Sequence, residues 1–119
     1  MHTICHIEFN VSDLARSQAF FHGLFPNWEF RSFIEGMVVF GIGDQHIGGL
    51  MKSDNIVAGN SPSVWFQVED IDATITRAAS LGGSAQDPKQ PVPGVGWSAT
   101  VHDPDGNNVG LVQFASQDS

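Results

Sequence analysis

The sequence contains one pattern twice, 57 residues apart. In each copy, an alternating strand pattern leads through an acidic turn into a segment with helical periodicity. The residues that coincide include Phe9 with Phe66, Asp13 with Asp70, and Leu24 with Leu81. A repeat of about this length predicts two copies of one supersecondary unit that share a sheet. A site formed between the copies should then draw corresponding residues from both.

The first copy begins with a strand predicted over residues 3–11. Strict alternation places His6, Glu8 and Asn10 on its polar face, which suits a wet concavity better than a core. Asp13, with Ser12 beside it, is a candidate N-cap for a helix that ends before Pro26. Three further strands are predicted, over residues 28–34, 37–42 and 45–51.

A polar linker over residues 52–62 separates the two copies. The second copy has a strand from residue 63, a helix capped by Asp70 or Asp72, and a stop at Gly82. Residues 85–94 carry three prolines and are predicted to be a loop. Strands follow over residues 96–102 and 108–114, joined by a tight turn over 103–107. We interpret both copies as βαβββ modules, at about residues 3–51 and 63–115, in one α+β domain over residues 1–119.

Charge and cysteine content exclude several classes of partner. Thirteen acidic residues against five Lys and Arg give a net charge of −8. Nucleic acids and anionic membranes bind through Lys and Arg, so we expect neither as a partner. Cys5 is the one cysteine, which precludes an intrachain disulfide and favours a reducing compartment. No apolar run approaches a membrane span and no signal-peptide pattern is present, so we expect a cytoplasmic protein.

The ordered motifs of the chain resemble the vicinal oxygen chelate superfamily, also called the glyoxalase/bleomycin-resistance/dioxygenase fold. The motifs that carry the resemblance are His6-Ile7 with Val11-x-Asp13-Leu14, then Phe20-Phe21-x-Gly23-Leu24, and Asp103-Pro104-Asp105-Gly106-Asn107 before an apolar strand. It covers about residues 3–115. It implies that each module curls into half of a cup made from a mixed sheet, with the helices on the outer face. It also implies a homodimer.

Metal-dependent members of that family place four His, Glu or Gln ligands on the first and last strands of the two modules. In this chain the resemblance puts those positions at His6, Gly49, Ser63 and Gly110. Glycine has no side chain, serine is a poor ligand, and a single imidazole does not hold a catalytic divalent ion. We therefore expect neither a metal nor another cofactor.

Two other residues could still contribute to a metal site. Glu8 lies two residues from His6 on the same strand face, so a His6/Glu8 pair is conceivable. His46 lies near the last strand of the first module, but it is offset from the ligand register.

The candidate ligand-binding residues are His6, Glu8, Asn10, Trp65, Gln67 and Trp97. His6 and Glu8 are the candidate acid and base; alternatively they are a hydrogen-bonded pair of the cavity wall. Trp65 and Trp97 are predicted to face the cup as stacking platforms, or to serve as packing residues. Asn10 and Gln67 coincide in the repeat and either contact the ligand or bond to each other.

These residues predict a small-molecule binding protein that holds its ligand in an apolar, aromatic cup without a metal. The alternative is an enzyme, which would be a lyase, isomerase or dioxygenase working with a metal or by acid–base chemistry. A third alternative is a homodimer with a vestigial cup. Whether the chain is an enzyme is left open by the sequence, because no nucleophile–base pair is visible.

Overall fold

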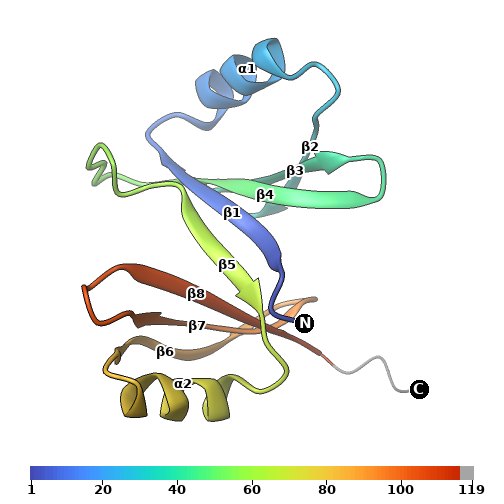
Figure 1. Ribbon diagram of the computed structural model, residues 1–119. Coiled ribbons are helices and arrows are strands. Elements are labelled where there is room, and N and C mark those ends of the chain that lie inside the picture. Colours follow the sequence, from blue (N-terminus) through green and yellow to red (C-terminus); the bar gives the residue numbers. More distant parts are fainter. Residues whose placement is uncertain (116–119) are drawn as a thin grey trace. The chain divides into compact units, whose positions relative to one another are not determined.

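The computed structural model describes residues 1–115 (Figure 1). The elements of this range are β1 (Ile4–Val11), α1 (Leu14–Leu24), β2 (Glu29–Ile34), β3 (Met37–Ile42), β4 (Gln45–Lys52), β5 (Ser63–Gln67), α2 (Ile71–Ser80), β6 (Ser84–Val92), β7 (Gly96–His102) and β8 (Asn108–Phe114). The chain divides into two compact units. The N-terminal unit is Cys5–Ser63, and the C-terminal unit comprises Met1–Ile4 and the chain from Val64 onward.

The strands of the N-terminal unit lie in the order β2-β3-β4-β1. Pairing is antiparallel except between β1 and β4, which are parallel, and α1 supplies the crossover along one face (Figure 1). That face carries the core, in which Val11, Phe40 and Leu50 are buried. Trp28 lies on Phe40 with ring centroids 4.5 Å apart. The odd positions of β1 therefore face α1, as the alternation predicts.

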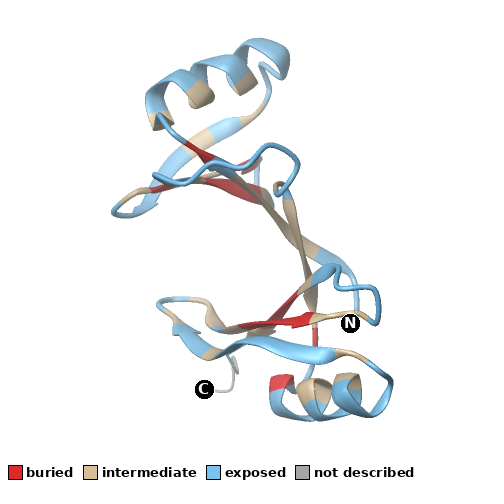
Figure 2. Ribbon diagram, turned by 90° about the vertical axis from the view of Figure 1, so that its left-hand side faces the viewer, coloured by how far each residue is buried: buried red, intermediate tan, exposed pale blue. Residues whose placement is uncertain are grey.

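The C-terminal unit repeats this arrangement with strand order β5-β8-β7-β6 and a parallel β5/β8 pair. Helix α2 covers the face that holds its buried core, and the buried segments lie in the middle of the strands (Figure 2). The core residues are Val68, Ile71, Ala99, Val101 and Leu111. The N-terminal residues His2 and Thr3 join this unit through main-chain hydrogen bonds with Gln67, of 2.7 and 2.9 Å.

The same device begins both helices. The carboxylate of Asp13 accepts a hydrogen bond from Arg16 N at 3.0 Å, and that of Asp70 accepts one from Ala73 N at 3.1 Å. Each satisfies a main-chain donor that the first turn leaves free. Gly82 follows α2 with φ of +95°, a conformation that side chains disfavour. The predicted caps and the glycine stop are confirmed.

The predicted loop over residues 85–94 is wrong, because β6 occupies most of it. This strand lies at the edge of the C-terminal unit and its register with β7 shifts twice. Proline is tolerated at a sheet edge because its missing N–H is not needed by a second neighbour. The Thr100 hydroxyl also ties the strand down, since it donates to Asp87 Oδ2 at 2.9 Å and accepts from Asp87 N at 3.0 Å.

The predicted α+β class with two βαβββ modules is confirmed. The turn over residues 103–107 forms as expected, with Asp103 N donating to Asn107 O at 3.0 Å and Gly106 at φ +85°. Among the residues that the structure describes, no helix is long and apolar enough to cross a membrane.

Candidate functional site

His6 and Glu8 lie on the face of the N-terminal unit that points away from α1. Their side chains are only 16% and 19% exposed, and His6 Nε2 lies 3.1 Å from Glu8 Oε1. The predicted proximity of these two residues follows from their i, i+2 spacing on β1, because alternate side chains of a strand share a face. The structure thus brings together a half-buried imidazole and a half-buried carboxylate.

His46 on β4 is a third member of this group, although the sequence predicts it to be offset from the register of His6. Its Nε2 lies 2.8 Å from His6 Nδ1, with the two ring planes 9° from parallel. Gly41 pairs with His46 but Phe40 pairs with Gly48, so a bulge adds one residue to β4 at Ile47. The bulge reverses which face His46 presents. The predicted offset of His46 from the register of His6 is therefore wrong.

Both ring nitrogens of His6 are therefore engaged. A neutral imidazole has one donor and one acceptor. With Glu8 ionised, the arrangement that satisfies every partner has His6 Nε2–H donating to Glu8 and His46 Nε2–H donating to His6 Nδ1. Partial burial lowers the pKa of His46, and the charges of His6 and Arg31 lower it further. The three side chains form one hydrogen-bonded chain that can hold or pass a proton.

Gly49 lies beside the His6 ring on this face of the sheet. It pairs with Glu8, its neighbour across the β1/β4 ladder. A Cβ atom built on Gly49 would lie 2.7 Å from Met37 Cε and 3.4 Å from His6 Cε1. The space that a metal-ligating side chain at position 49 would need is thus filled by Met37 and His6.

The C-terminal unit repeats this device with a different ring. Trp65 pairs with Gly110 across β5 and β8, and a Cβ on Gly110 would overlap the Trp65 indole. The two glycines occupy equivalent register positions in their modules. Gly110 accommodates the Trp65 ring, whereas the nearest neighbour at Gly49 is the end of Met37 and the His6 ring lies at ordinary contact distance.

Trp97 does not share the face of Trp65, which corrects the prediction that both point the same way. Trp97, Ala99 and Val101 are every second residue of β7, so they share one face of the strand. Because Ala99 and Val101 belong to the core, this is the face on the side of α2. Lys89 Nζ lies 4.9 Å from the Trp97 ring centroid and 3.0 Å from Asp72 Oδ2 on α2. The side chain is 38% exposed, so Trp97 is a surface ring stacked on a lysine.

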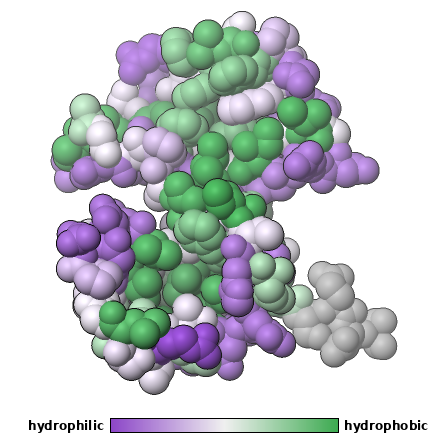
Figure 3. All heavy atoms as spheres, viewed as in Figure 1, coloured by the Kyte–Doolittle hydropathy of each residue, from purple (hydrophilic) through white to green (hydrophobic). Residues whose placement is uncertain are grey.

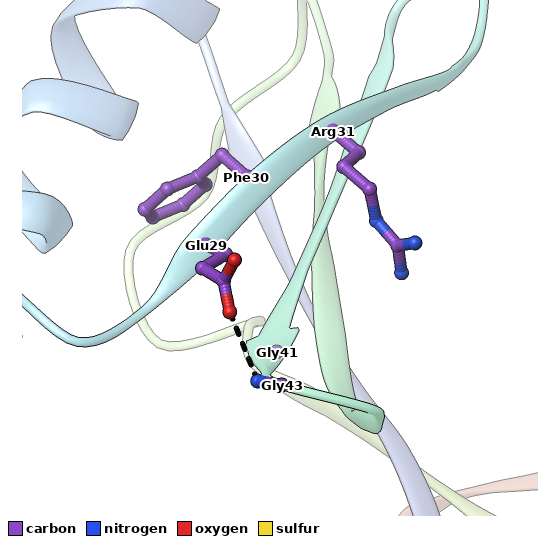
Figure 4. Close-up of a pocket in the computed structure, with 5 residues that line it drawn as sticks. All are labelled: Glu29, Phe30, Arg31, Gly41 and Gly43. Atoms are coloured by element: carbon purple, nitrogen blue, oxygen red, sulfur yellow. Dashed lines mark hydrogen bonds between the residues drawn. The ribbon is translucent and has the colours of Figure 1, made fainter.

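The remaining candidates are less constrained. Asn10 is exposed near the end of β1, and the half-buried Gln67 forms part of the β5/β8 ladder opposite Val112. Two hollows of the N-terminal unit lie apart from His6 and Glu8. One of about 360 Å³ lies on α1, and one of about 140 Å³ lies at the β2/β3 edge, between Glu29, Phe30, Arg31, Gly41 and Gly43 (Figure 4).

The residues at the family's ligand positions do not fit a metal ion. Both nitrogens of His6 already have partners, and Gly49 and Gly110 offer no donor atoms. A metal ligand needs a free lone pair aimed at a shared point. Within residues 1–115, no group of three His, Cys, Asp or Glu side chains is placed to hold a metal ion.

Comparison with known proteins identifies the family. The model of the glyoxalase/bleomycin resistance protein/dioxygenase superfamily matches residues 3–111. The chain therefore belongs to this superfamily, and the resemblance read from its motifs is confirmed.

Among individual relatives, CFP32 of Mycobacterium tuberculosis, named provisionally as a glyoxylase, is 35% identical over 75 residues. That match covers 63% of this chain but only 29% of CFP32.

Solved structures share the fold at low identity. Methylmalonyl-CoA epimerase from Mycobacterium tuberculosis has a TM-score of 0.71 at 17% identity, over 96% of this chain and 89% of that one. An extradiol ring-cleaving dioxygenase from B. fuscum has a TM-score of 0.73 at 19% identity, over 100% of this chain and 34% of that one. At such identities the likeness concerns the fold alone.

Proposed function

We propose that this chain is a small-molecule binding protein that holds its ligand without a resident metal ion. The observation that carries the proposal is the engagement of His6 on both sides, by His46 at 2.8 Å and Glu8 at 3.1 Å, over a glycine. A metal would have to displace one of these partners. The same side chains are polar and half-buried, which suits hydrogen bonding to an organic ligand.

Trp65 and Gln67 are proposed as ligand contacts within the C-terminal unit. Trp65 presents a large ring backed by Gly110, and flat rings favour planar ligands. Asn10 is retained as a candidate contact because it shares the β1 face with His6 and Glu8. Trp97 is the weakest of the predicted contacts, since its ring stacks with Lys89 on the α2 side.

A second candidate function is acid–base catalysis, as a lyase or isomerase. The chain from His46 through His6 to Glu8 favours it, because such a chain can take a proton at one end and release it at the other. In this function Glu8 is the group that exchanges a proton with the substrate, and His6 orients it. Mixing candidate substrates with the protein in D2O and following proton exchange by NMR separates catalysis from binding.

We further propose a homodimer that uses α1. Phe20, Leu24 and Phe25 are 61%, 55% and 41% exposed, and Figure 3 shows hydrophobic side chains at the surface of this part of the N-terminal unit. Burying three such side chains gives a contact its apolar centre. Sedimentation velocity of the wild type and of Phe20→Glu tests this contact.

The acidic charge and the single cysteine support a cytoplasmic protein without nucleic-acid or membrane partners. Filter binding to DNA tests the lack of a nucleic-acid partner, and co-sedimentation with anionic vesicles tests the lack of a membrane partner, both at low salt.

The function is tested by a thermal-shift screen of small organic molecules in EDTA. A molecule that binds the native state raises the melting temperature by mass action. We expect at least one compound to raise the melting temperature of the wild type in EDTA. The same compound should raise that of His6→Gln by less, and that of the control His22→Gln on α1 by as much as in the wild type. Stabilisation that appears only after a divalent metal is added contradicts the proposal.

A further inference from the structure

One row of residues crosses the whole sheet of the N-terminal unit. Arg31 on β2 pairs with Val39, Val39 pairs with Gly49, and Gly49 pairs with Glu8 on β1. Paired residues of neighbouring strands share a face, so Arg31 and Glu8 lie at opposite ends of the row. Three strand spacings separate their Cα atoms, roughly 14 Å in all. The His6 ring lies between them, over Gly49.

Arg31 is the member of this row that lacks a partner. Among the described residues, its guanidinium forms no hydrogen bond or ion pair. The carboxylate of Glu29, two residues earlier, instead accepts a hydrogen bond from Gly43 N at 3.0 Å. Figure 4 shows Glu29 turned to Gly43 and Arg31 extending away from it. The N–H donors of this exposed guanidinium are thus left unused, although the chain has thirteen acidic residues.

The surroundings of Arg31 suit a ligand group. The hollow of about 140 Å³ at the β2/β3 edge is lined by Glu29, Phe30 and Arg31 and by the main chain at Gly41 and Gly43, and the Glu29 carboxylate in it is already bonded to Gly43 N. A water molecule occupies about 30 Å³ of liquid, so the hollow is large enough for a carboxylate. The positive charge of Arg31 also lowers the pKa of His46, after the larger effect of burial. Arg31 and the His46–His6–Glu8 chain therefore lie on one face of the sheet, with Val39 and Gly49 between Arg31 and Glu8.

We propose that the ligand of this chain is a small organic carboxylate, with Arg31 binding the carboxylate group and Glu8 facing a hydrogen-bond donor at the other end of the molecule. A guanidinium binds a carboxylate through two parallel hydrogen bonds, which a neutral amide does not reproduce. The overall charge of −8 repels anions, so recognition of an anion needs a local cation. This inference rests on the proposed binding function and names its substrate class.

The experiment tests the Arg31 part of the proposal. It compares benzoate with benzamide, a neutral molecule of nearly the same shape, by ¹H–¹⁵N NMR titration in EDTA at constant ionic strength. We expect benzoate to shift amide signals of β2, β3 and β4, and to bind at least five-fold more tightly than benzamide. Arg31→Gln should remove this preference, and Arg31→Lys should retain only part of it. Arg16→Gln is the matched control, since Arg16 lies in the same unit and bonds to Ser12 at 2.8 Å.

Equal binding of benzoate and benzamide, or unchanged benzoate affinity in Arg31→Gln, overturns the carboxylate inference. If the thermal-shift screen still finds neutral ligands that need His6, the proposed binding function stands without it. If nothing binds in either experiment, both fail together. The NMR spectrum of each variant also reports its folding, so loss of binding through unfolding is recognised directly.

Discussion

His6 Nδ1 on β1 and His46 Nε2 on β4 lie 2.8 Å apart, within hydrogen-bonding distance, in the N-terminal unit. His46 reaches this position because of the β4 bulge at Ile47. The bond orients His6 so that its other nitrogen meets Glu8. A second imidazole thus occupies the place where a metal ion would use the His6 lone pair.

The first prediction concerns pH. Burial, and then the charges of His6 and Arg31, lower the pKa of His46 below its usual 6.5. The unfolded chain therefore binds more protons at this residue between the lowered pKa and 6.5. The contribution of His46 to the free energy of unfolding is complete above pH 6.5 and is lost as the pH falls through that window.

Urea unfolding of the wild type and His46→Gln between pH 5 and 7.5 measures this contribution. As the pH falls, the free energy of unfolding of the wild type should decrease more than that of His46→Gln. A difference that stays constant across the window contradicts the assigned direction.

The second prediction ranks three glycine substitutions. Gly110→Ala should cost about 1–3 kcal/mol of unfolding free energy, because its Cβ overlaps the rigid Trp65 ring. Gly49→Ala should cost less, because the nearest atom is the flexible end of Met37. Gly23→Ala, with open space around it in α1, should stabilise by up to about 1 kcal/mol. Urea midpoints test the order, and an equal cost for Gly110→Ala and Gly49→Ala would show that the ring contact is not limiting.

The third prediction concerns the helix caps. Asp13→Ala and Asp70→Ala each remove an acceptor for a first-turn N–H and should each cost about 1 kcal/mol. Asp54→Ala, whose carboxylate has no cap to form, is the control. If Asp13→Ala and Asp70→Ala unfold at the same temperature as this control, the caps do not contribute to stability.

The repeat made most of the fold predictable. The alternation of β1, the caps at Asp13 and Asp70, and the turn at Gly106 are local signals, and each was confirmed. The strand β6 was missed because three prolines outweigh a weak pattern in sequence. Its edge position, which makes those prolines harmless, depends on tertiary pairing.

The candidate site was predictable only in part. His6 and Glu8 follow from i, i+2 spacing, but His46 depends on a bulge that the register reveals. The glycines at 48 and 49 were the one available signal, since glycine within a strand often marks a bulge. Trp97 lies on the face opposite to the predicted one, because it shares one side of β7 with the core residues Ala99 and Val101.

The central claim is that no metal ion is needed at His6. Isothermal titration of the EDTA-dialysed chain with Zn²⁺, Mn²⁺, Ni²⁺ and Fe²⁺, beside His6→Gln, tests it most directly. We predict that the wild type binds no stoichiometric ion that His6→Gln fails to bind. One equivalent of any of these ions, bound at micromolar affinity by the wild type and lost in His6→Gln, contradicts the account.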